Sequence, residues 1–557
     1  MPKNNNNSNL VLEEYESEFS YQKPKSNLII SFNRVAFIFF VFLIISIIFY
    51  WKAIYLCGFN KVEKKLEIFK LNFRSTILDN SGNIIAKTVI TNHIGIDPKL
   101  VINKQKLLIN LKLILPNKNF NEIEKKLNGK NFFYIHKKIS QEKLEELLLL
   151  GDKSIIPEEK IARIYPQENL FSHIVGQIDD DNNGISGIEK SYDFELRKDN
   201  KPLHLTLDTN IQFLIREELI KFQKIFRNKG SASILMDVNN GNILSMISLP
   251  DFNLNKREEI KDVNFINRAT KAVYEFGSVF KTFTVAAALH ERLIETDTKF
   301  LNLEKKIDCG KHTIGEYDNK MPSDLTAEQI LIRSSNIGSV KIAQKLGIEK
   351  FVLFLKKIGI LEKIEFDIEE VGQAPILQWG KCKLATASFG HGISTTLLQL
   401  VKGYSIITNG GYYIEPTLIN KDNKKINQRR RILKKEVSEK INPILRKVVS
   451  TKEGTAGFAN VFGYEVGGKT GTADKPKFGG YSKDKINTFV SIFPTSKPKY
   501  VLLVLLDEPK PSKEYVYHYR DGRKPYKGNW RNTAGWTSVE ITGKIIEKIG
   551  PILATKY

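Results

Sequence analysis

An almost unbroken apolar run near the N-terminus constrains this chain more than any other feature. Residues 35–51 read VAFIFFVFLIISIIFYW, and the run continues beyond Lys52 to Phe59. A helix of about 17–25 apolar residues spans the hydrocarbon core of a bilayer. A cleaved signal peptide has a shorter apolar region and a small-residue cleavage site, which this segment lacks. A buried core helix is the alternative, but the run shows no amphipathic pattern. We therefore predict an uncleaved membrane anchor over residues 35–58.

Length and charge narrow the remaining possibilities. A chain of 557 residues is too long for one core, which indicates two or three domains. The formal net charge of +23 suits nucleic acid, an anionic wall or a membrane surface. No arginine–aromatic cluster or nucleic-acid motif accompanies the charge, so we expect it to be spread over solvated faces, with no nucleic-acid partner. Lysines flank the apolar run on both sides, and their count does not orient the anchor.

Beyond the anchor, the pattern predicts an α+β fold. Short strands flanking turns and apolar helices of period 3.6 alternate along the chain, with strands early and late in its second half. We expect these late and early strands to join in one sheet with helices between them. The predicted strands are 74–79, 84–86, 232–238, 242–249, 487–493 and 500–506, and the predicted helices are small ones within 100–165 together with 278–293, 385–408 and 538–549.

Cysteine, histidine and acidic residues predict no metal site. All eight histidines are isolated from one another. Asp179, Asp181, Asn183 and Gly184 match the start of a calcium-binding loop, but Lys190 stands where that loop needs a bidentate glutamate. We expect a turn there instead. Three cysteines give no disulfide framework, although one bridge between Cys309 and Cys382 is possible.

The first motif that indicates chemistry is Ser278-Val279-Phe280-Lys281. Lys281 lies one helical turn after Ser278 and on the same side of the predicted helix. The residues that follow are nearly all apolar, so an ammonium group there is costly to desolvate. A lowered pKa avoids that cost and makes the amine a general base for the hydroxyl. Alternatively, Ser278 is a helix N-cap and Lys281 extends to solvent. The Ser-x-x-Lys pattern also occurs at Ser20, Ser140, Ser482 and Ser496.

Two further motifs follow in order along the chain. Ser334-Ser335-Asn336 places a hydroxyl that can relay a proton near an amide that can bond both Lys281 and a substrate. Lys469-Thr470-Gly471-Thr472 lies in a glycine-flanked stretch that predicts an edge strand. There Lys469, Thr470 and Thr472 suit a substrate carboxylate, and the Thr472 N–H can pair with that of Ser278 as an oxyanion hole. Taken singly, the two motifs are more commonly explained as a polar turn and a glycine-rich strand end.

The order of the three motifs is the signature of penicillin-binding proteins and β-lactamases. From about Arg74 to the C-terminus the chain resembles the class B penicillin-binding proteins. The sequence around Ser278 is most similar to that of the division-specific septal transpeptidases, although Phe276 stands where both class B subtypes often carry proline. The supporting stretches are residues 163–166 (RIYP), 187–190 (GIEK), 205–208 (LTLD), 267–269 (NRA) and 388–392 (SFGHG).

The resemblance implies a four-part organisation. Residues 1–34 are a cytoplasmic tail, 35–58 the transmembrane anchor, 59–225 an elongated pedestal of the dimerisation type, and 226–557 a transpeptidase domain. The last is expected to hold an antiparallel sheet flanked by helices. The chain is then a single-pass protein of the bacterial inner membrane, with its catalytic domain outside the cytoplasm at the division septum.

The implied activity is serine-type D-Ala-D-Ala transpeptidation of peptidoglycan, with β-lactams as inhibitors and no cofactor or metal. Ser278 is the expected nucleophile, Lys281 its base, and Ser334 and Asn336 the relay. Lys469, Thr470, Gly471 and Thr472 form the expected substrate-binding strand. Stem peptides, lipid-linked precursor strands, a glycosyltransferase and other division proteins are the expected partners. The alternatives are an elongation-specific transpeptidase, a D,D-carboxypeptidase or β-lactamase, and a non-catalytic division scaffold.

Overall fold

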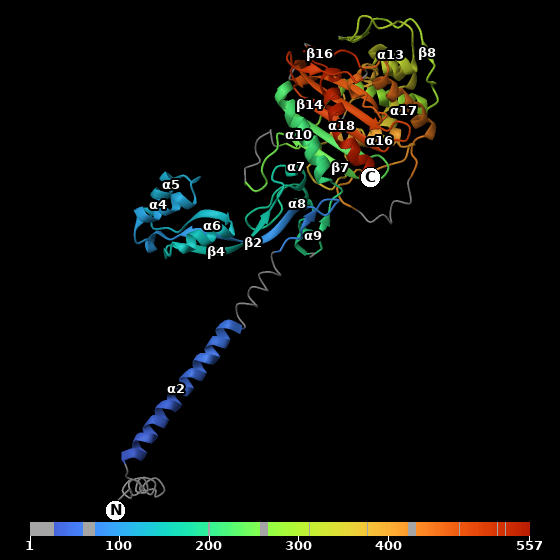
Figure 1. Ribbon diagram of the computed structural model, residues 1–557. Helices are drawn as coiled ribbons and strands as arrows, with labels where there is room; N and C mark the ends of the chain where they lie inside the picture. The colour runs from blue at the N-terminus through green and yellow to red at the C-terminus, as the bar shows by residue number, and fades with distance from the viewer. Residues whose placement is uncertain are drawn as a thin grey trace, which may run out of the picture. The chain divides into compact units, whose positions relative to one another are not determined.

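The structure is a computed structural model that describes residues 27–58, 73–198, 201–256, 266–310, 312–375, 377–420, 430–477, 480–520, 522–529 and 531–557. It divides into two compact units, Met1–Phe73 and Arg74–Tyr557. The first contains helix α2 (Asn27–Gly58), shown in blue in Figure 1. Within α2, Arg34–Tyr55 is long and apolar enough to cross a membrane, with a mean hydropathy of 2.4. Most of the predicted tail, residues 1–26, lies outside the described residues.

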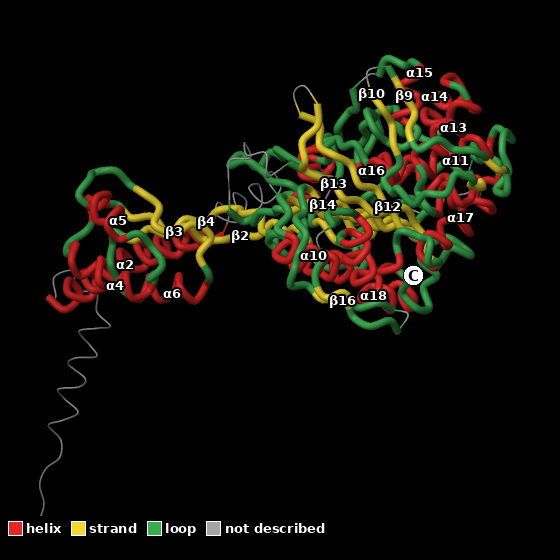
Figure 2. Tube along the Cα trace, turned by 90° about the horizontal axis from the view of Figure 1, so that it is seen from above, coloured by secondary structure: helices red, strands yellow, loops and turns green. Residues whose placement is uncertain are grey.

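The N-terminal part of the second unit is a small mixed sheet with helices on it. Strand order is β3-β2-β1-β5, with β4 also paired to β2. Helices α4, α5 and α6 contribute Leu111, Leu127 and Leu147 to a separate apolar core beside Ile94 of the sheet. Figure 2 shows these helices against β2, β3 and β4. The bounds are β1 Ile77–Leu78, β2 Ile84–Ile96, α4 Lys104–Ile114, α5 Phe120–Leu127, β3 Phe133–Ile139, α6 Gln141–Leu149, β4 Ile155–Ile164, α7 Ser172–Val175, α8 Gly187–Ser191, α9 Asp193–Lys198 and β5 Leu203–His204.

The expectation of helices alone within residues 100–165 was therefore incomplete, because β3 and β4 also lie there. Strand β3 buries Ile135 and Ile139 and exposes Lys137 and Lys138. Strand β4 buries Ile155 and exposes Glu159 and Lys160. That mixture of residues also fits a helical period over short windows. Long-range pairing with β2, from Lys87↔Ile164 to Ile96↔Ile155, decides the outcome for β4.

The C-terminal part is built on a five-stranded antiparallel sheet in the order β12-β13-β14-β6-β7. The prediction that early and late strands join is confirmed, since β14 pairs with β6, from Tyr500↔Asp237 to Asp507↔Gly230, across almost half of the chain's length. Every residue of β14 is buried, so helices cover both faces of the sheet. Helices α10 and α18 pack together against one face, and α16 contacts β6 and β14 from the other (Figure 2).

The predicted hairpin around Asn239-Asn240-Gly241 is present, with Gly241 at φ +79° in its turn. The predicted helix over 385–408 is wrong as a single element. It is two helices, α15 and α16, separated by a turn in which Gly390 and Gly392 adopt φ of +80° and +68°. These left-handed conformations cannot continue a helix.

The remaining bounds are α10 Thr209–Phe226, β6 Gly230–Asp237, β7 Ile243–Leu249, the 3₁₀ turn η3 Gly277–Phe280, α11 Lys281–His290, β8 Lys299–Phe300, β9 Lys306–Cys309, β10 His312–Gly315, β11 Leu325–Thr326, α12 Ala327–Ile332, α13 Asn336–Leu346, α14 Ile348–Lys357, α15 Lys381–Ala387, α16 Leu397–Thr408, α17 Lys435–Ser450, β12 Gly467–Lys477, β13 Gly480–Phe493, β14 Tyr500–Asp507, β15 Val516–Tyr517, β16 Tyr526–Lys527 and α18 Ser538–Lys556.

Candidate active site

Ser278 lies in a tight turn that leads into a buried helix. Gly277, at φ +57°, opens the 3₁₀ turn η3, which passes directly into α11. The Gly277 N–H donates to the Gly390 carbonyl at 3.1 Å. Phe276 and Phe280, not Ser278, occupy the capping positions. The alternative of Ser278 as a helix N-cap is therefore excluded, and its side chain lines a cleft instead.

Lys281 is fully buried beneath that cleft. Its Nζ donates to the Ser334 carbonyl at 2.5 Å, to Ser334 Oγ at 3.1 Å and to Asn336 Oδ1 at 2.7 Å. Burial lowers the pKa of Lys281 to about 7, against an opposing effect of Glu316. The alternative of a lysine that reaches solvent is excluded, and the amine is neutral in about half of the molecules near neutral pH.

Ser334 holds the centre of the cluster in a strained conformation. Its φ of +61° places a non-glycine residue in the left-handed region, between the end of α12 and the start of α13. This bend turns its carbonyl and its hydroxyl toward Lys281 together. Ser335 then caps α13 by accepting the Gly338 N–H at 2.9 Å.

The second lysine reaches the same hydroxyl from the opposite side. Lys469 is fully buried on β12, the edge strand of the sheet. Its Nζ donates to Ser334 Oγ at 2.9 Å and to the Thr470 carbonyl at 3.1 Å. Burial, followed by repulsion from Lys281, holds the pKa of Lys469 well below its usual value. Two amines that share one hydroxyl therefore avoid carrying two full charges.

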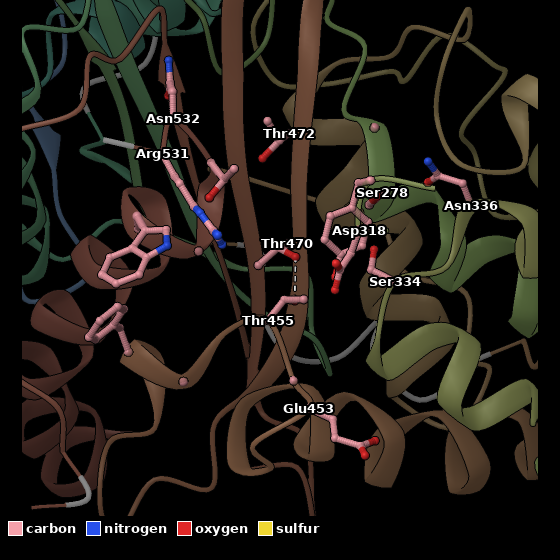
Figure 3. Close-up of a pocket in the computed structure, with 18 of the residues that line it drawn as sticks. Ser278, Asp318, Ser334, Asn336, Glu453, Thr455, Thr470, Thr472, Arg531 and Asn532 are labelled. Carbon is pink, nitrogen blue, oxygen red and sulfur yellow. Dashed lines mark hydrogen bonds between the residues drawn. The ribbon is translucent and has the colours of Figure 1, made fainter. Parts of the chain in front are cut away.

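The threonines of β12 face the same cleft. Thr470 Oγ1 shares a hydrogen bond of 2.8 Å with Thr455 Oγ1, drawn as a dashed line in Figure 3. Thr472 Oγ1 accepts the Ala534 N–H at 2.9 Å. Thr455 and Ala534 belong to no motif that sequence reasoning could have used. Thr455 lies in the loop after α17, and Ala534 begins a short 3₁₀ turn, Ala534–Trp536. These two contacts fix the threonine hydroxyls on one wall of the cleft.

Glycines bring β12 against the turn that carries Ser278. A Cβ on Gly471 would lie 2.1 Å from the Phe276 carbonyl oxygen. A Cβ on Gly277 would lie 2.7 Å from the Thr472 carbonyl oxygen. Only glycine allows this approach of two backbones. The contact sets the Ser278 turn beside the free edge of the sheet.

The cleft has a volume of about 1140 Å³. In Figure 3, Thr470 and Thr472 lie on the strand, and Ser278, Ser334 and Asn336 lie across from them. Lys281, Lys469 and Gly471 lie beneath this surface. The structure thus brings all eight predicted site residues into one cluster. Basic and acidic side chains farther along the cleft are Lys320, Lys452, Lys485, Arg523, Arg531, Asp318, Glu453 and Asp474.

Two regions outside the cleft contain residues that the sequence analysis singled out. Among the described residues, no group of three or more His, Cys, Asp or Glu side chains could hold a metal ion. The Asp179 carboxylate instead accepts the backbone and side-chain N–H groups of Asn183, as the predicted turn requires. Cys309 and Cys382 form a disulfide between β9 and α15, which the sequence had left open.

Comparisons with known proteins agree with this geometry. Residues 231–523 match the penicillin-binding protein transpeptidase domain, and residues 72–212 match the penicillin-binding protein dimerisation domain. The chain is 28% identical to a probable peptidoglycan D,D-transpeptidase FtsI of Caulobacter vibrioides, over 87% of this chain and 82% of that protein. It is 29% identical to stage V sporulation protein D of Bacillus subtilis, over 78% and 74% of the two chains.

A solved structure supports the fold. A peptidoglycan synthetase from Bifidobacterium adolescentis superposes with a TM-score of 0.65 at 19% identity, covering 87% of this chain and 96% of that one. The two matched domains together account for most of the second unit. The chain therefore belongs to the class B penicillin-binding proteins, the family that joins this dimerisation domain to a transpeptidase domain working by acyl transfer.

Proposed function

We propose that this protein is a membrane-anchored D,D-transpeptidase that cross-links peptidoglycan stem peptides during septum formation. The observation that carries the proposal is the buried Lys281 amine, with a pKa of about 7, one turn beyond Ser278. A scaffold without catalytic activity has no use for an amine in that environment, because desolvation destabilises the fold.

In the first half of the reaction, Ser278 Oγ attacks the carbonyl carbon of the penultimate D-Ala and its proton passes to the Lys281 amine. The oxyanion accepts hydrogen bonds from the Ser278 and Thr472 N–H groups. The C–N bond then breaks, and the terminal D-Ala leaves with a proton delivered through Ser334. Within the described residues no hydrogen bond joins Lys281 Nζ to Ser278 Oγ, and Ser334 Oγ, which both lysines bond, supplies the route for the proton.

In the second half, the amine of a neighbouring stem attacks the ester carbonyl. It loses a proton to Lys281, and Ser278 recovers its own proton as the new amide forms. The free edge of β12 lets the donor peptide lie alongside as an added strand. Lys469, Thr470 and Thr472 then meet its terminal carboxylate, whose negative charge raises the pKa of Lys469 and so restores the ammonium group that binds it.

We assign the domains as residues 1–34 cytoplasmic tail, 35–58 anchor, 59–225 pedestal and 226–557 transpeptidase domain. The span α2 and the two matched domains support this division. The substrates belong outside the cytoplasm, so we place the catalytic domain there. A glycosyltransferase that polymerises lipid-linked precursors and other division proteins are the partners this role requires.

The test of the nucleophile is labelling by a fluorescent penicillin. We expect Ser278→Ala to abolish labelling, because the acyl-enzyme forms on that oxygen. Ser140→Ala is the matched control, since Ser140 also begins a Ser-x-x-Lys pattern and makes no capping hydrogen bond through its side chain. Labelling of Ser278→Ala at the wild-type level would remove Ser278 from its role.

Two further measurements separate the alternatives. Incubation with uncross-linked peptidoglycan should yield dimeric stems, whereas release of D-Ala without dimers would indicate a carboxypeptidase. Depletion of the protein should produce filamentous cells, and rounded, swollen cells would instead assign it to elongation.

A further inference from the structure

A carboxylate outside the three motifs holds the Ser334-Ser335-Asn336 segment in place. Glu316 Oε1 accepts the Ser335 Oγ–H at 2.5 Å and the Ile337 N–H at 3.0 Å. Glu316 Oε2 accepts the Asn336 N–H at 2.9 Å. One side chain therefore bonds three consecutive residues at the start of α13.

The Asn336 amide is fixed from the same segment. Its Nδ2 donates to the Gly315 carbonyl at 2.8 Å, while its Oδ1 accepts the Lys281 amine at 2.7 Å. The amide group thus connects residue 315, at the end of β10, directly to Lys281. Because both ends of the amide are engaged, its orientation cannot reverse without the loss of both bonds.

The β9–β10 hairpin determines where Gly315 and Glu316 lie. Its strands pair from His312↔Cys309 to Gly315↔Lys306. The disulfide from Cys309 to Cys382 ties this hairpin to α15. The hairpin is therefore held at one end by a covalent bond and reaches the catalytic cluster at the other.

Capping accounts for only part of what Glu316 does. Ser335 accepts the Gly338 N–H of α13, and the Glu316 carboxylate accepts the Asn336 and Ile337 N–H groups, which also lack partners within the helix. Glu316 accepts the Ser335 Oγ–H as well. Its negative charge also acts on Lys281, for which it opposes the effect of burial. Each of the two buried lysines is affected by one charged group. The Glu316 carboxylate, just after β10, acts on Lys281, and the Lys281 amine acts on Lys469 of β12.

We propose that Glu316 is a positioning residue for acyl transfer, which fixes Asn336 and through it sets the place and the charge environment of the Lys281 amine beneath Ser278. The proposal rests on the proposed role of Lys281 as the base. A glutamine at this position keeps the size of the side chain but presents an NH₂ group to backbone N–H groups, and it removes the charge. An aspartate keeps the charge and shortens the reach.

The experiment measures the acylation rate constant of the full-length protein in detergent with a fluorescent penicillin, at pH values on both sides of the Lys281 pKa of about 7. For Glu316→Gln we expect the acid limb of the profile to move to lower pH, because loss of the carboxylate lowers the pKa of Lys281 further. We also expect a plateau reduced on the order of tenfold, short of the ~10²-fold cost of losing a general base. Glu316→Asp should keep the wild-type limb with a smaller loss.

Glu304→Gln is the matched control, because Glu304 pairs with Lys341 of the same helix α13 but away from its N-terminus. It should retain the wild-type profile. An unchanged limb in Glu316→Gln overturns the proposal, whether or not the plateau falls, since loss of stability alone lowers the rate without moving the limb. If Glu316→Gln does not fold, a wild-type plateau in Glu316→Asp, whose shorter side chain disturbs the hydrogen bonds to residues 335–337, overturns the proposal. Ser278→Ala, measured in parallel, shows separately whether the proposed function holds.

Discussion

Replacing Lys281 by methionine should remove a specific pH dependence of stability. In the folded protein the pKa of Lys281 is about 7, against 10.5 for the group in water. Between these two values the unfolded chain binds a proton that the folded protein does not. Stability therefore rises with pH across this window, and the cost of burying the amine is largest below the folded pKa.

The magnitude follows from the shift. One proton released on folding is worth about 1.36 kcal/mol per pH unit. Because Lys281 is half protonated at the lower limit, the free energy of unfolding of the wild type should rise by about 2 kcal/mol from roughly pH 7 to roughly pH 9, relative to Lys281→Met. Loss of Lys281 also removes the charge that repels Lys469, which moves the pKa of Lys469 toward its usual value and adds to the difference in the same direction.

The assay is urea unfolding of the purified protein in detergent at the two pH values, followed by intrinsic fluorescence. The hydrogen bonds that Lys281→Met loses are a cost common to both pH values, so they cancel in the comparison. Lys345→Met, on the exposed side of α13, is the control and should follow the wild type. An equal stability difference between wild type and Lys281→Met at both pH values would refute the claim that burial lowers the pKa of this amine.

Two other changes test the geometry around the nucleophile. Gly471→Ala would place a Cβ 2.1 Å from the Phe276 carbonyl oxygen and should slow acylation by ~10²-fold through displacement of β12. The control is Gly380→Ala, whose Cβ meets no atom within 4 Å, and it should keep the wild-type acylation rate. Equal acylation rates in the two variants would show that the contact between β12 and Phe276 is not required. Reduction of the Cys309–Cys382 disulfide, which spans 73 residues, should lower the free energy of unfolding by about 4 kcal/mol. Urea unfolding with and without reductant measures this difference. An unchanged unfolding midpoint would show that the bridge does not stabilise the domain.

The sequence predicted which residues lie together in the cluster because each motif spans only a few consecutive residues. The interval from Ser278 to Lys281 is set by one helical turn, and a glycine-flanked strand such as that around Gly471 is readable without tertiary information. The apolar residues after Lys281 also indicated burial, and hence the direction of its pKa. The sheet formed from early and late strands was predicted from short apolar runs at both ends of the domain, with helices between them.

The contacts that tie the cluster together could not be read in the same way. Thr455 meets Thr470 only because the loop after α17 returns to β12. Glu316 and the disulfide depend on a two-stranded hairpin of four residues a side, too short to stand out by periodicity. Strand β4 was missed because its partner β2 lies far along the chain, and pairing, rather than local preference, decides its conformation.

At Ser334 the backbone conformation lowers the stability of the fold, whereas the side chain is needed for the reaction. A glycine would accept φ +61° freely, and removing such a conformation from a non-glycine residue recovers on the order of 1 kcal/mol. The same replacement deletes the oxygen on which both amines converge. No residue at position 334 provides both an unstrained backbone and a hydroxyl group. Selection for a more stable enzyme therefore favours glycine at this position, and selection for a faster enzyme favours serine.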